Sequence, residues 1–216
     1  MAILPARTPV KAEEWFPTEG RTQEEGFACG GSRQGMILPM RIARTFVTIA
    51  VTVVLATAVS AQVKKGEIAG ITNYSRVDAT VGCGGATKPT AMAALGNEGF
   101  KSVINLRLAT EEGVDIDGSR AAAQAAGMKY IHLPFDVAKP DPALVDNFLA
   151  AVSDKSNQPV YIHCGSANRV GAVWMIKRVL QDGWDTQKAQ EEAEAIGLTN
   201  PRLKEFATGY ITAHKK

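Results

Sequence analysis

The chain has 216 residues, and its 24 lysines and arginines nearly balance its 22 aspartates and glutamates, giving a net charge of +2. The basic residues form no stripe, which argues against a nucleic-acid partner. The three cysteines and three histidines lack the spacing of zinc ligands, so the sequence predicts no metal site, and it indicates no cofactor.

The first 39 residues do not have the pattern of a folded domain. They mix Pro, Glu, Gly, Arg and Ser without an apolar period, so we interpret residues 1–39 as a non-native or disordered leader. Signal peptides stand at the start of a protein, and the segment that follows this leader has the pattern of one. We therefore expect Met36 or Met40 to be the true initiator.

Residues 40–61 predict a secretory signal peptide. Two arginines precede an apolar run over residues 45–59, and small residues follow it, as at signal-peptidase sites. The run is short for a membrane span. We expect cleavage before Gln62, a periplasmic or secreted product, and no stable membrane span after cleavage.

Residues 62–216 have the length of one domain with a sizeable core. Strand patterns alternate with helix patterns, which predicts an α/β fold: a mainly parallel central sheet flanked by helices. The expected strands are a hairpin within 71–81, then 100–106, 129–133 and 159–162. The expected helices begin at Thr87 and at Asp141-Pro142, cover 118–126, begin again at Arg169, and cover 186–196 and 201–213, the last capped by Asn200.

The stretch 158–184 carries the clearest chemistry. A short apolar strand leads through His163 and Cys164 into a loop of small residues, and a helix begins at Arg169. Backbone N–H groups of such a loop can converge on an anion at the positive end of the helix. The same field favours a thiolate nucleophile at Cys164, and the Arg169 guanidinium can hold two phosphoryl oxygens. The predicted phosphate-binding residues are Gly165, Ser166, Ala167, Asn168 and Arg169.

The sequence HCGSANRVGA, the turn at residues 182–184 and the upstream stretches VGCGGATKP and SVINLR resemble cysteine-dependent protein tyrosine and dual-specificity phosphatases. The similarity covers roughly residues 74–197 and is closest to the bacterial branch named after beta-lactamase-hydrolase-like proteins. It implies a dual-specificity-phosphatase-like fold, hydrolysis of a phosphate monoester through a cysteinyl-phosphate, and a role for His163 in tuning the thiolate. Two features depart from ordinary members: only four residues separate Cys164 from Arg169, and Val170 stands where they have Ser or Thr.

A phosphatase of this kind needs a carboxylic acid to protonate the leaving oxygen, and two aspartates lie on the loop upstream. Asp141 precedes a proline, so its duty as a helix cap explains it without catalysis. Asp136 has no such duty in the sequence. We predict Asp136 as the general acid, with a solvated loop aspartate as the alternative.

Other residues have two interpretations. Ser166 either hydrogen-bonds the thiolate or is simply small enough for the loop to curl, and we favour the second. Cys83 is either a packed thiol or a partner that forms a disulfide with Cys164. Acidic side chains follow the predicted strand at residues 100–106, and we interpret them as a solvated surface: Glu111, Glu112, Asp115 and Asp117.

Three functions follow from these residues. The first is an exported phosphatase that acts on a phosphorylated protein or a small phosphomonoester. The second is a rhodanese-like sulfurtransferase that carries a persulfide on Cys164, because rhodaneses share the four-residue spacing. The third is a non-catalytic phosphate-binding pseudophosphatase.

Overall fold

The computed structural model describes residues 63–215. The predicted leader (1–39) and signal peptide (40–61) lie outside the described residues. Within the described part, no helix is both long and apolar enough to cross a membrane.

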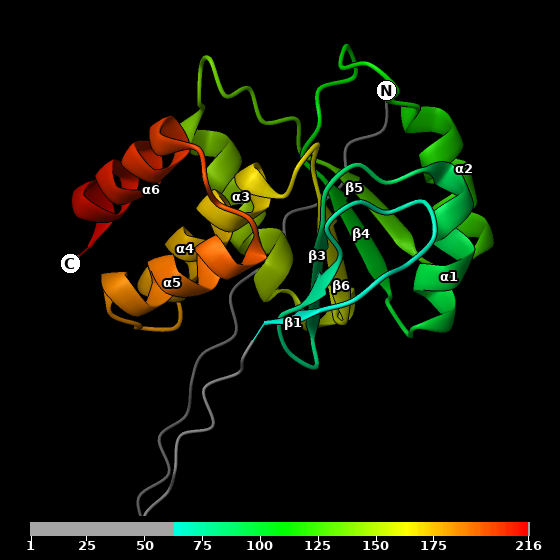
Figure 1. The fold of residues 1–216 in the computed structure, drawn as a ribbon, viewed down its shortest axis with the longest axis horizontal. Coiled ribbons are helices and arrows are strands. Elements are labelled where there is room, and N and C mark those ends of the chain that lie inside the picture. Colours follow the sequence, from blue (N-terminus) through cyan, green and yellow to red (C-terminus); the bar gives the residue numbers. More distant parts are fainter. Residues whose placement is uncertain (1–62, 216) are drawn as a thin grey trace, which may run out of the picture. The chain divides into compact units, whose positions relative to one another are not determined.

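The centre of the fold is a six-stranded sheet in the order β1-β2-β3-β6-β4-β5 (Figure 1). Its strands are β1 (Lys64–Lys65), β2 (Ser75–Arg76), β3 (Val81–Gly84), β4 (Ser102–Asn105), β5 (Lys129–His132) and β6 (Val160–His163). β3, β6, β4 and β5 are mutually parallel, whereas β1 and β2 join the β3 edge as antiparallel strands. The sheet is therefore mixed, and the expectation of a mainly parallel sheet holds only for the four strands β3, β6, β4 and β5.

Helices cover both faces of the sheet (Figure 1), with α1 and α2 on one face and α3 to α6 on the other. Their bounds are α1 (Met92–Asn97), α2 (Ile116–Ala125), α3 (Pro142–Ser153), α4 (Asn168–Leu180), α5 (Thr186–Ile196) and α6 (Pro201–His214), with short 3-10 helices at Pro89–Ala91 and Lys155–Asn157. The single-domain α/β arrangement predicted from alternating patterns is thus confirmed for these residues.

The larger part of the core lies between the sheet and α4. Ten of the thirteen residues of α4 are buried, because α3, α5 and α6 surround the helix and the sheet lies beneath it. Gly171 allows the close approach of α5: a Cβ there would lie 2.8 Å from the Ala193 carbonyl oxygen and from the Leu198 Cβ. The start of α4 is therefore held in place by the larger of the two core clusters of the described residues.

Helix starts that depend on local sequence are confirmed. Asp141 caps α3 by accepting a hydrogen bond from the Ala143 N–H at 2.9 Å. Asn200, the residue before Pro201, caps α6. The expected cap at Thr87 is wrong. Its hydroxyl instead bonds the Tyr161 hydroxyl at 2.8 Å, and α1 begins only at Met92 without a side-chain cap.

Gly82 and Gly84, which follow Val81, belong to β3. Aromatic side chains from neighbouring strands occupy the space that a side chain would need: a Cβ would lie 2.4 Å from the Phe100 ring at Gly82 and 2.1 Å from the Tyr161 hydroxyl at Gly84. Close approach explains these glycines.

Candidate active site

The residues of the central motif lie at the carboxyl ends of three neighbouring parallel strands. Gly84 of β3, His163 of β6 and Asn105 of β4 are in register at this edge. Cys164 follows directly, and its N–H donates to the Gly84 carbonyl at 3.3 Å. In sheets of this kind ligands bind at this edge.

The loop after Cys164, residues 165–169, presents a row of unpaired donors that we call the cradle. None of its backbone N–H groups donates a hydrogen bond to another group of residues 63–215. Ala167, the residue before α4, has no side chain that could cap the helix. Its φ of 71° is left-handed, a strained conformation for a residue with a Cβ. Free N–H groups at the positive end of a helix are suited to an anion.

Both described cysteines are free thiols on one face of the sheet. Cys83 pairs in register with Ile162, and Cys164 lies two residues beyond Ile162. Cys164 is 1% exposed at the mouth of the cradle, whereas Cys83 is fully buried. Burial raises the pKa of the Cys83 thiol well above its usual range. This environment favours the packed-thiol interpretation of Cys83.

His163 points to the opposite face from Cys164, where its ring stacks on Tyr161 with the ring centroids 5.8 Å apart. Neither ring nitrogen has a hydrogen-bond partner among residues 63–215. Burial, together with the nearby guanidinium of Arg107, lowers the pKa of the imidazole to about 3. His163 is therefore neutral at physiological pH and contributes no positive charge to the site.

The guanidinium of Arg169 is held along one edge. Nη1 donates to the carbonyl oxygens of Leu106 and Phe135, each at 3.1 Å. Nη1 and Nη2 also donate to the two carboxylate oxygens of Glu111, at 2.5 and 2.9 Å. No oxygen of the described chain accepts a hydrogen bond from the Nε–H or from the second Nη2 hydrogen, and the side chain also interacts with the Cys164 thiol. These two donors form the other edge of the planar group and are available for two oxygens of one anion.

Glu111 is a site residue that the sequence analysis missed, because we assigned it to a solvated acidic surface. Besides Arg169, it accepts from Arg107 Nε at 3.0 Å and from the Leu108 N–H at 2.8 Å. Partial burial alone would raise the pKa of the carboxyl, but the hydrogen bonds from Arg169, Leu108 and Arg107 lower it to about 2. The spacing of Arg107 and Glu111, four residues apart after a buried strand, is the one local signal of this pairing.

The rest of the acidic segment is also only partly a solvated surface. Asp115 caps α2 by accepting a hydrogen bond from the Gly118 N–H at 2.8 Å. Glu112 and Asp117 are exposed, as expected. The interpretation of a solvated surface is therefore wrong for Glu111 and right for these two side chains.

A cavity of about 420 Å³ opens beside the cradle and contains Asp136. Arg169 donates to the carbonyl oxygen of Phe135, so the neighbouring Asp136 lies close to the guanidinium. The carboxylate is exposed and accepts a hydrogen bond from the Ala138 N–H at 2.8 Å. Asp141 does not line this cavity. Of the two candidate acids, only Asp136 therefore lines the cavity beside the cradle.

Two side chains of the cradle stabilise the loop itself. Asn168 accepts from the N–H groups of Thr199 and Asn200, both at 2.7 Å, and thereby ties the cradle to the connection between α5 and α6. The Ser166 hydroxyl accepts from Asn168 Nδ2 at 3.2 Å. Val170 is fully buried. Within the described residues, no group of three or more His, Cys, Asp or Glu side chains could hold a metal ion.

The comparisons with known proteins agree with this geometry. The family model of the beta-lactamase hydrolase-like protein, phosphatase-like domain, matches residues 73–181. No curated protein matches the chain. TpbA of Pseudomonas aeruginosa is 23% identical with a TM-score of 0.56, covering 73% of this chain and 92% of TpbA. A complex of TpbA with phosphotyrosine is also known.

Two further structures share the fold. A DUF442 phosphatase from Shewanella putrefaciens CN-32 is 20% identical with a TM-score of 0.57, covering 68% of this chain and 94% of that one. The core catalytic domain of the PP-IP phosphatase SIW14 from Saccharomyces cerevisiae is 19% identical with a TM-score of 0.55, covering 66% and 87%. The fold, the Cys164–Arg169 loop and the family match lead to one conclusion. The chain belongs to the beta-lactamase hydrolase-like phosphatase family, a bacterial branch of the cysteine-dependent phosphatases.

Proposed function

We propose that this protein hydrolyses phosphate monoesters through a cysteinyl-phosphate on Cys164. One observation carries the proposal: the unpaired N–H groups of the cradle and the free edge of Arg169 lie beside the only described thiol at the mouth of the site. Together they supply the donors that a phosphoryl group with three charged oxygens needs.

The chemistry proceeds in two steps. The Cys164 thiolate attacks phosphorus, the bond from phosphorus to the ester oxygen breaks, and Asp136 gives its proton to the departing oxygen. A water molecule then attacks the cysteinyl-phosphate, its proton returns to Asp136, and the sulfur leaves as a thiolate with release of inorganic phosphate. Arg169 and the cradle stabilise the negative charge in both transition states.

The cavity favours a substrate with a single phosphate on an apolar or aromatic body. Arg169 is the only cationic side chain among its described lining residues, and Glu111 offsets that charge. Apolar walls come from Leu108, Val137 and Leu203. A second phosphate would find no basic partner there. The phosphotyrosine bound by TpbA is a substrate of the favoured kind, and both a phosphorylated protein and a small phosphomonoester fit it.

The signal-peptide pattern in residues 40–61 supports export of the proposed enzyme. N-terminal sequencing of the product made from the native gene tests this part alone. A start at Gln62 in the periplasmic or secreted fraction is expected. A product that keeps residues 40–61, or that stays in the cytoplasm, would contradict export without affecting the chemistry.

Hydrolysis of an aryl phosphate and of a phosphotyrosine peptide tests the activity. The wild-type protein should release phosphate from both, Cys164→Ser should release none while still binding inorganic phosphate, and the matched control Cys83→Ala should remain active. Substantial activity in Cys164→Ser would refute the nucleophile. Thiocyanate production from thiosulfate and cyanide, without phosphate release, would indicate a sulfurtransferase instead. Phosphate binding with neither activity would indicate a pseudophosphatase.

A further inference from the structure

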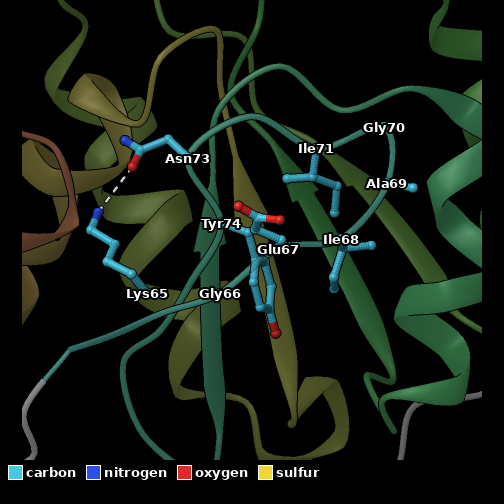
Figure 2. Close-up of a pocket in the computed structure, with 9 residues that line it drawn as sticks. All are labelled: Lys65, Gly66, Glu67, Ile68, Ala69, Gly70, Ile71, Asn73 and Tyr74. Carbon is cyan, nitrogen blue, oxygen red and sulfur yellow. Dashed lines mark hydrogen bonds between the residues drawn. The ribbon is translucent and has the colours of Figure 1, made fainter.

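Residues 66–73, the N-terminal strap, connect β1 to β2 and run along an open cavity of about 730 Å³ (Figure 2). On one side of this cavity the side chains of Lys65 and Asn73 point toward each other, away from Ile68 and Ile71, as Figure 2 shows. Nothing in the proposed chemistry uses the strap. Asn73 at its end nevertheless contacts the cradle, although the two are far apart in the sequence.

The side-chain amide of Asn73 is shared between two carbonyl groups. Its Nδ2 donates to the Ser166 carbonyl at 3.4 Å and to the Ile196 carbonyl at 3.3 Å. Its Oδ1 accepts from Lys65 Nζ at 2.9 Å, and the same ammonium donates to Ile196 at 3.2 Å. Lys65 therefore holds the amide in the orientation that presents Nδ2 to the cradle.

The neighbouring carbonyl of the cradle is also held from outside. The Ala86 N–H donates to the Gly165 carbonyl at 2.9 Å. Thr72 in the strap holds Gly85 and Ala86 in place. Its N–H donates to the Ala86 carbonyl oxygen at 2.9 Å, and its own carbonyl oxygen accepts from the Gly85 N–H at 2.7 Å. Two successive carbonyl groups of the cradle thus have partners on the strap side.

Peptide geometry turns these contacts into a constraint on the donors. In a planar trans peptide the C=O of one residue points opposite to the N–H of the next. A Ser166 carbonyl fixed toward Asn73 therefore fixes the Ala167 N–H toward the interior of the cradle. We propose that Asn73 is a positioning residue that locks the Ser166–Ala167 peptide in the phosphate-binding orientation.

The left-handed backbone of Ala167 explains why a lock is needed. Its φ is 71°, and rotation of the Ser166–Ala167 peptide plane would bring φ to a negative value that an alanine prefers. The same rotation would replace the inward N–H by a carbonyl oxygen, which repels an anion. Strain at Ala167 thus favours the inactive orientation, and the Asn73 amide opposes it.

Gly197 provides the room that the amide needs. A Cβ at this position would lie 2.8 Å from Asn73 Nδ2 and 3.0 Å from the Ala167 Cβ. Asn73 itself has a φ of 52°, a conformation that Asn and Gly tolerate better than other residues. Asn73→Gly therefore removes the amide without straining the strap, and Asn73→Asp keeps its size but replaces the donor with an acceptor.

The inference rests on the proposed function, and calorimetric binding of inorganic phosphate tests it without requiring turnover. Asn73→Gly should bind phosphate about tenfold more weakly, or about 1.4 kcal/mol, which is the size of the strain in one left-handed residue. kcat/KM on an aryl phosphate should fall by a similar factor. Asn73→Asp should lose at least as much, and the exposed helix control Asn147→Asp should change neither quantity.

A double variant separates a lock from a general packing role. Ala167→Gly removes the bias against the left-handed conformation, so it should restore most of the phosphate affinity in the Asn73→Gly background. Unchanged affinity in Asn73→Gly, or no restoration by Ala167→Gly, would overturn the lock. A wild-type protein that binds phosphate but hydrolyses nothing would refute the proposed function and not the lock, whereas one that does not bind phosphate would overturn both.

Discussion

α4 has a buried arginine in its first turn, Arg169, and another near its last turn, Arg178. Only Arg178 has carboxylate partners for Nε and for both Nη atoms. Arg178 donates from Nε and Nη2 to Glu192 at 2.6 and 3.1 Å, from Nη1 to Asp182 at 2.9 Å, and from Nη2 to Asp78 at 3.3 Å. Arg169 has the single carboxylate of Glu111, and no oxygen of the described chain accepts from the other edge of its guanidinium, which lies beside the Cys164 thiol.

The aromatic surroundings extend this difference. The guanidinium of Arg178 lies over the rings of both Trp174 and Trp184, at 4.7 and 4.4 Å from their centroids. Burial alone would lower its pKa, but Glu192 and Asp182 raise it, so the charge is permanent and compensated. A buried arginine whose donors and faces are filled stabilises the fold, whereas one with an open edge can accept a ligand.

The largest expected effect comes from replacing each arginine by lysine. Arg169→Lys should lower kcat/KM on an aryl phosphate by about 10³-fold, because an ammonium cannot make the two parallel hydrogen bonds of the free edge. Arg178→Lys should leave the kcat/KM of the folded protein within a few-fold but lower the midpoint of urea unfolding. Near-wild-type rates in Arg169→Lys would remove the distinction between the two residues.

The carboxylates that surround Arg178 should matter for stability only. Glu192→Gln should lower the free energy of unfolding by about 3 kcal/mol, the lower end of the range for breaking a buried ion pair, because Asp182 and Asp78 still offset the charge. Urea unfolding measures this, with the exposed Glu191→Gln as the control. A variant that stays as stable but loses activity would place the Arg178 cluster in the function instead.

Asp136 and Asp141 form a second such pair, one carboxylate proposed to act in the chemistry and one that caps a helix. Asp136→Asn should cost about a hundredfold in rate on an alkyl or tyrosyl phosphate, and less on a substrate with a good leaving group. Asp141→Asn should change neither rate nor stability, because Asn caps a helix about as well as Asp. If the leaving-group dependence appeared in Asp141→Asn instead, our choice of the acid would be wrong.

The smallest effect concerns Glu111, whose carboxyl pKa is lowered to about 2 in the folded protein. A lowered pKa adds stability above the unfolded value of about 4.3, and this contribution disappears as the pH falls from there to about 2. Glu111→Gln should therefore flatten the dependence of the unfolding free energy on pH in this window. Urea unfolding at several pH values measures it, and the exposed Glu112→Gln should keep the wild-type slope.

The sequence predicted the features that depend on neighbouring residues. Asp141 before Pro142 and Asn200 before Pro201 indicate their helices without any tertiary information. Thr87 shows the limit of this reasoning, because its hydroxyl is taken by Tyr161, 74 residues away. A side chain with the right type and position for a helix cap can instead hydrogen-bond a buried partner that is distant in the sequence.

The candidate site likewise contains residues that are adjacent in the sequence and residues that are distant in it. The Cys164–Arg169 loop is contiguous, so its spacing and the resemblance made it visible. Glu111 is 58 residues from Arg169, and Asn73 is 93 residues from Ser166. Both are polar side chains in loops, where a solvated position is the ordinary expectation. Only the register of the parallel strands and the path of the N-terminal strap bring them to the cradle.

The unpaired amides of the cradle also make occupancy directly observable by nuclear magnetic resonance. An N–H group that gains a charged acceptor changes its proton chemical shift, and residues 165–169 contribute five such groups on a rigid helix start. In a protein labelled with ¹⁵N, titration with phosphate would follow each donor separately. The Ala167 resonance alone would report whether its peptide faces the anion, even in variants that no longer turn over substrate.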